Sequence, residues 1–249
     1  MKTAWVFLAV LVATAGNAAT PLPREESQPL KKAQQIAPLD PEQKALIEAQ
    51  QWLKSLRYEL TLDGVKALKK LRLQMYGTIN GVSTQTLISN DNLRHLKVLR
   101  NLEELALPTW TNDDGISNVA GLIRLKVLNV PTAKLTNAAM SHLKNLAAME
   151  SLVLTGANID DAGVSQLAGM SNLQILNLSN SGITDAGMDH VGKLASLQML
   201  FLARTAITDA SIPQLVKLKG LRRLDIVGTG ITAAGREKIR ATIPRIEIN

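Results

Sequence analysis

The stretch LQILNLSNSGITDAG, residues 173–187, decides the fold because it recurs along the chain. One period later the sequence is LQMLFLARTAITDAS, residues 197–211. Its L-x-L pair begins at six positions, spaced first by 23 residues and then four times by 24: Leu105, Leu128, Leu152, Leu176, Leu200 and Leu224. We also expect a final partial copy, with Ile246 and Ile248 as its pair. A fixed period of this length indicates a repeat protein in which each unit packs only against its neighbours.

Each repeat combines one short strand with one short helix. The second position of the L-x-L pair is apolar in every copy, so both inward sites of a strand are filled. A Thr or Asp then precedes a small-residue segment such as Asp185-Ala186-Gly187. These predicted helix N-caps are Thr136, Asp160, Thr184, Thr208 and Thr232. An Asp or Asn just inside the helix favours the positive end of the helix dipole.

Residues 88–249 resemble the leucine-rich repeats of bacterial exported proteins, with the consensus L-x-x-L-x-x-L-x-L-x-x-T-x-I-T-D-A-G. They are similar to the cysteine-containing class of these repeats, but no Cys or Asn follows the strands. The residues there are Trp110, Ala133, Ala157, Ser181, Thr205 and Thr229. The resemblance implies an α/β leucine-rich-repeat solenoid, a right-handed horseshoe arc with parallel strands on the concave face and short helices on the convex face. It also implies a protein-interaction scaffold without catalytic residues.

The chain divides into four predicted parts. Residues 1–19 have the layout of a secretory signal peptide, with Lys2, an apolar run over 4–15 and small residues before a cleavage site after Ala18 or Ala19. We therefore expect a periplasmic or secreted protein with no transmembrane span after cleavage. Residues 20–39 are a Pro-rich linker, 40–87 a helical and irregular N-terminal cap, and 88–249 the repeats with a polar C-terminal capping repeat.

The N-terminal cap begins with a predicted helix from Asp40 to about Arg57, with Asp40 as N-cap and Pro41 in the first helical position. We expect Trp52 to pack on its apolar face. Residues 63–73 resemble half a repeat, and an insertion of about ten residues around 76–86 contains the turn signal Asn80-Gly81.

Composition excludes several function classes. The chain has no Cys, which removes disulfides, Cys-ligated metals and cysteine nucleophiles. The net charge of +7 arises mainly from residues 61–100, and export argues against nucleic acid as a partner. His95, His142 and His190 fall in one predicted solvated column of the helices, too far apart to share a metal ion. We therefore expect no metal, no cofactor and no enzyme.

The predicted binding site lies on the concave face, where strand residues flanking the buried leucines point outward. Its candidate residues combine apolar side chains with arginines: Val153, Ile175, Met199, Phe201, Arg204 and Arg223. Such groups suit a protein hot spot. Two alternatives remain, namely that β-propensity alone selected the apolar residues or that the N-terminal segment folds over them. Trp110 either joins this surface or fills the insertion.

The sequence thus predicts an exported, non-enzymatic module that binds an unidentified protein partner through its concave face. One alternative is a polyanion binder that uses the basic 61–100 segment on lipopolysaccharide or acidic polysaccharide. Another is a secreted host-interaction factor or a structural envelope protein.

Overall fold

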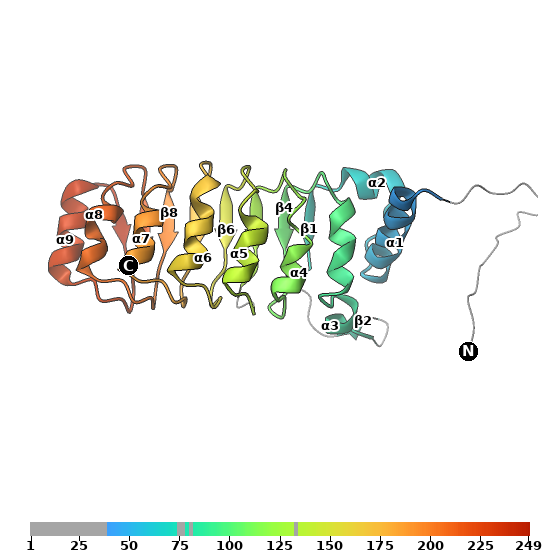
Figure 1. Ribbon diagram of the computed structural model, residues 1–249, viewed down its shortest axis with the longest axis horizontal. Helices are drawn as coiled ribbons and strands as arrows, with labels where there is room; N and C mark the ends of the chain where they lie inside the picture. The colour runs from blue at the N-terminus through green and yellow to red at the C-terminus, as the bar shows by residue number, and fades with distance from the viewer. Residues whose placement is uncertain (1–38, 74–77, 80–81, 132–133) are drawn as a thin grey trace, which may run out of the picture. The chain divides into compact units, whose positions relative to one another are not determined.

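The computed structural model describes residues 39–73, 78–79, 82–131 and 134–249. The predicted signal peptide and nearly all of the predicted linker lie outside these residues. Within them, a parallel sheet forms one layer and helices form the other, as Figure 1 shows. The predicted α/β solenoid of parallel strands and short helices is therefore confirmed.

The sheet has eight strands, which follow one another in chain order apart from a separate hairpin. They are β1 (Lys70–Arg72), β4 (Glu104–Ala106), β5 (Val127–Asn129), β6 (Ser151–Val153), β7 (Ile175–Asn177), β8 (Met199–Phe201), β9 (Arg223–Asp225) and β10 (Glu247–Ile248). The hairpin pairs β2 (Thr78–Ile79) with β3 (Val82–Ser83) in the predicted insertion, and its connecting Asn80-Gly81 lies outside the described residues.

The helical layer consists of short α and 3-10 segments. They are α1 (Pro41–Ser55), α2 (Leu62–Ala67), α3 (Thr84–Leu87), η1 (Asn92–Val98), α4 (Asp113–Ser117), α5 (Asn137–Leu143), α6 (Asp161–Ser165), η2 (Gln166–Gly169), α7 (Asp185–Val191), η3 (Asp209–Ser211), α8 (Ile212–Leu215) and α9 (Ala233–Thr242). Each helix of the described residues is too short or too polar to cross a membrane.

The core is a stack of leucines between these two layers. The central leucines of neighbouring strands lie opposite one another, as Leu152, Leu176 and Leu200 do, and all three are fully buried. The strand β1 joins the same stack, because Leu71 is paired with Leu105. The predicted register of the last copy is wrong: Ile248, not Ile246, lies opposite Leu224.

Side-chain hydrogen bonds also join the helical layer from one repeat to the next. The first residues of α4, α5, α6, α7 and η3 each accept a bond from the backbone N–H of the next repeat's N-cap, at 2.8–3.1 Å. The acceptor and N-cap pairs are Asp113–Thr136, Asn137–Asp160, Asp161–Thr184, Asp185–Thr208 and Asp209–Thr232. We call these five pairs the inter-repeat latches. The four threonines also donate through Oγ1 to the same carboxylates.

The latch between Asp209 and Thr232 changes the acidity of its carboxylate. Bonds from the backbone and side chain of Thr232 lower the pKa of Asp209 below its ordinary value. The folded state therefore favours the charged form of Asp209. The stability that this charged form adds is present above about pH 4 and is lost as the pH falls through the lowered pKa. From the sequence, the positive end of the helix dipole accounts for the aspartates of the latches. In the structure they also accept hydrogen bonds from the N-cap of the next repeat.

The latches also explain the glycine two residues after the Asp in several repeats. A Cβ built on Gly187 would lie 2.3 Å from Oδ1 of Asp161, the latch carboxylate of the preceding repeat. The same conflict arises at Gly163 with Asn137 and at Gly235 with Asp209. A glycine here gives the neighbouring repeat's acceptor more room, although the latches of Asp113 and Asp185 also form beside the equivalent residues Ala139 and Ser211.

The N-terminal helix forms as predicted. The Oδ1 of Asp40 accepts from the backbone N–H of Gln43 at 2.8 Å, and Pro41 is the first helical residue. Trp52 is buried on the inner face of α1, where its Nε1 donates to the carbonyl oxygen of Leu87 at 2.9 Å. The expectation that Trp52 packs within the protein is confirmed.

His95 departs from the solvated column predicted for the histidines. It is buried, and its ring stacks on Trp52 with the ring centroids 5.5 Å apart. Burial, assisted by the nearby Arg94 and opposed by Glu48, lowers the pKa of His95. His95 therefore joins α1 to η1 as a neutral, packed side chain, and the prediction of solvation is wrong for it.

We expect the substitution Gly187→Ala to lower the free energy of unfolding by about 1 kcal/mol, because Asp161 must shift to admit the added methyl group. Thermal and urea unfolding measure the change. The control is Gly121→Ala, where a Cβ meets no heavy atom within 4 Å and a change within about 0.5 kcal/mol is expected. Equal stability of the two variants contradicts the role assigned to the glycine.

Candidate functional site

The sheet presents one face away from the helices, and the first and third residues of each strand point out from it. We call this the sheet face; it corresponds to the face predicted to be concave. Strand pairing aligns the first residues in the order Lys70, Glu104, Val127, Ser151, Ile175, Met199, Arg223 and Glu247. The third residues run Arg72, Ala106, Asn129, Val153, Asn177, Phe201 and Asp225.

Three of the predicted apolar site residues gather around β8. Ile175 and Met199 are register partners on β7 and β8. Phe201 follows Met199 two residues later on the same strand and therefore on the same face. All three side chains are half-buried. Val153 stands apart, because Asn177 lies between it and Phe201 in their common row.

Arg223 completes this group from β9. It is the register partner of Met199, and its guanidinium carbon lies 5.7 Å from the ring centroid of Phe201. An arginine at this distance from an aromatic face makes a cation–π contact. We call Ile175, Met199, Phe201 and Arg223 the β8 patch.

Arg204 lies just beyond β8, exposed and in an unusual backbone conformation. Its φ is 55°, in the left-handed region that costs most side chains about 1 to 2 kcal/mol. The equivalent positions in three other repeats hold residues that tolerate this region better, namely Gly156, Asn180 and Gly228. The fold needs only the backbone of this position, whose N–H donates to the carbonyl oxygen of Val227 at 2.7 Å.

A groove of about 870 Å³ adjoins the β8 patch where the strands begin. Met199 and Arg223 line it together with the basic residues Lys219, Arg222 and Arg245. The groove was not predicted from the sequence, because Lys219, Arg222 and Arg245 precede β9 and β10, and strand alternation does not place such residues. The recurrence of basic residues just before these strands was the signal that could have revealed it.

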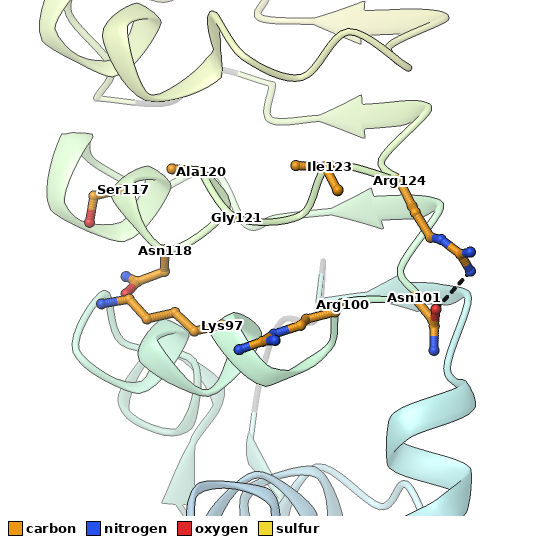
Figure 2. Close-up of a pocket in the computed structure, with 9 residues that line it drawn as sticks. All are labelled: Lys97, Arg100, Asn101, Ser117, Asn118, Ala120, Gly121, Ile123 and Arg124. Carbon is orange, nitrogen blue, oxygen red and sulfur yellow. Dashed lines mark hydrogen bonds between the residues drawn. The ribbon is translucent and has the colours of Figure 1, made fainter. Parts of the chain in front are cut away.

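A second groove, of about 720 Å³, lies among the helices and loops of the first repeats. Lys97 extends into it from η1 and Arg100 from the turn that follows, and Ile123 and Arg124 border it from the next repeat (Figure 2). The guanidinium of Arg124 donates to Oδ1 of Asn101 at 2.8 Å. Ile123 is 67% exposed, the largest value among the exposed large apolar residues of the described chain.

The structure divides the basic 61–100 segment between different surfaces. Lys69 and Lys70 form ion pairs with Glu103 and Glu104, with N–O distances of 2.8 and 2.5 Å. The bonds from Lys69, with those from Lys126, lower the pKa of Glu103. Lys97 and Arg100 instead line the groove of Figure 2. The segment is thus not a single basic surface.

Trp110 belongs to the packing of the first repeats. It is half-buried against the core, and its Nε1 donates to the carbonyl oxygen of Ile88 at 3.0 Å. Of the two alternatives left by the sequence, this contact favours filling of the N-terminal insertion.

Comparison with known proteins agrees with this architecture. Family models described as leucine-rich repeats match residues 148–168 and 171–231. Internalin C2 from Listeria monocytogenes is similar in structure, with a TM-score of 0.56 and 18% identity over 84% of this chain and 92% of that one. No curated protein sequence matches the chain. The repeating sequence, the parallel sheet and these matches show that the chain contains leucine-rich repeats and folds as an α/β leucine-rich-repeat solenoid.

Proposed function

We propose that this protein is an exported, non-enzymatic interaction module that binds a protein partner through its sheet face. The observation that carries the proposal is the β8 patch, where aromatic, thioether and guanidinium groups occupy neighbouring strands. Aromatic residues, Met and Arg are the types enriched at protein interfaces.

The fold does not need apolar side chains at these positions. The inward leucines Leu176, Leu200 and Leu224 are fully buried and join the strands to the core. Equivalent outward positions in other repeats are polar, such as Ser151 and Asn177. Binding accounts for the apolar choice at β7 and β8 better than stability does.

The chemistry of the patch also supports binding over catalysis. Apolar side chains contribute buried area, and a guanidinium donates hydrogen bonds and stacks on rings. None of these groups acts as a general base near neutral pH or as an activated nucleophile of the usual kinds. The β8 patch is therefore suited to recognition.

We expect the double variant Met199→Glu, Phe201→Glu to weaken capture of the native partner about tenfold or more, because carboxylates replace the apolar contact area. Crosslinking pull-down from envelope and medium fractions, quantified by mass spectrometry, measures the capture. The matched control is Ile123→Glu, which makes the same kind of change at an exposed apolar residue outside the sheet face. Wild-type capture by a folded double variant overturns the proposal.

Export rests on the N-terminal sequence, with Lys2, the apolar run and the small residues that end at Ala19. Expressed with its full N-terminus, the mature protein is expected to begin at Ala19 or Thr20. N-terminal sequencing of the protein outside the cytoplasm checks this. Recovery of Met1 as the N-terminus there instead indicates an uncleaved anchor.

Binding of an anionic polysaccharide is a second candidate, favoured by the groove that Lys97, Arg100 and Arg124 line in Figure 2. Such binding weakens steeply with salt and depends on these three residues, whereas apolar contacts at the β8 patch are much less sensitive to salt. The double variant above therefore leaves polysaccharide binding unchanged.

A further inference from the structure

The groove beside the β8 patch carries an excess of positive charge. Lys219, Arg222, Arg223 and Arg245 line it and are exposed, and Glu247 is the acidic residue of its lining. The groove is open to solvent on one side and continuous with the apolar patch through Met199 and Arg223. A concave surface lined by one sign of charge concentrates its electric field and favours ligands of opposite charge.

These cations are not neutralised by ion pairs within the described residues. The basic members of the ion pairs there are Lys69, Lys70, Lys126 and Arg240, and none of these lines the groove. At the opposite end of the sheet, by contrast, Lys70 pairs with Glu104 on the sheet face. The charge beside β9 is therefore available to a ligand.

We propose that this groove binds the carboxylates of an acidic segment in the protein partner, while an apolar side chain of the same segment contacts the β8 patch. This inference rests on the proposed function, because it specifies the chemistry of the partner. Arginine suits the role since its planar guanidinium binds a carboxylate through two parallel hydrogen bonds.

The spacing of the groups fits one short peptide. Met199 and Arg223 are register partners on adjacent strands, which lie about 4.8 Å apart. Successive residues of an extended peptide are about 3.3 Å apart. An apolar residue and an acidic residue one or two positions away can therefore reach the patch and the groove together.

The test uses three labelled synthetic peptides and the full mature chain, with binding followed by fluorescence anisotropy. The peptide EDELFEDE carries both features, QNQLFQNQ lacks the charges, and EDEGGEDE lacks the apolar pair. The variant Arg222→Gln, Arg245→Gln removes two groove cations outside the β8 patch, and Lys144→Gln, Lys193→Gln is its matched control, at two exposed lysines outside both grooves. Thermal unfolding confirms that both variants are folded.

We expect EDELFEDE to bind most tightly, and the groove variant to weaken this binding about tenfold while the control variant leaves it unchanged. Raising NaCl from about 0.05 M to about 0.5 M is expected to have a similar effect, because salt screens exposed charges. Binding of QNQLFQNQ is expected to be weak and the same in all three proteins.

Three results overturn the inference: no binding of EDELFEDE, equal binding of EDELFEDE and QNQLFQNQ, or equal loss in the groove and control variants. Any of these leaves the proposed function standing if partner capture still depends on Met199 and Phe201. Failure of the proposed function is a different result, namely native capture that survives Met199→Glu, Phe201→Glu.

Discussion

The structure depends on one constraint: a repeat of about 24 residues cannot bury its leucines against itself. Leu152, Leu176 and Leu200 are fully buried only because they stack in register with one another. The inter-repeat latches maintain that alignment in the helical layer, where Asp161 accepts bonds from both the backbone and the hydroxyl of Thr184. Each repeat therefore supplies a leucine to the core that it shares with its neighbours and a threonine that caps its own helix. It also supplies an aspartate that accepts hydrogen bonds from the N-cap of the next repeat.

This arrangement separates the residues that build the fold from those that face outward on the sheet. The inward side chains of each strand supply the core, and the latches act among the helix starts on the other layer. Outward positions of the strands neither fill the core nor form latches. Their residue type can therefore differ between strands, as Ser151 and Met199 do, while the strand pairing stays the same. The β8 patch occupies such positions near the C-terminal end of the sheet, and the basic groove adjoins it where β9 and β10 begin. We propose that their chemistry serves recognition of a partner.

The periodic sequence predicts most of the fold because burial and capping are local and recur in register. The strands at Leu105 to Leu224 and the N-caps from Thr136 to Thr232 lie where their spacing indicates. Features that depend on a contact between distant segments could not be predicted from the repeat pattern. His95 is buried by Trp52 from a helix more than forty residues earlier, and the bond that Thr184 donates to Asp161 appears only once the repeats are stacked. The candidate residues around β8 were predictable from alternation, whereas the basic groove is formed by residues that precede the strands and that alternation does not place.

We propose that residues near β8 serve binding at some expense to folding, and a substitution at Arg204 measures both effects directly. Asn180 occupies the same left-handed position one repeat earlier, so Arg204→Asn retains the backbone and removes only the side chain's charge and reach. We predict that this variant raises the free energy of unfolding by about 0.5 to 1 kcal/mol, because Asn tolerates the left-handed region better than Arg. We predict at the same time that it weakens partner capture by about fivefold or more, because Arg is a common hot-spot residue. Unchanged capture by the variant, measured in parallel with urea unfolding, contradicts the account.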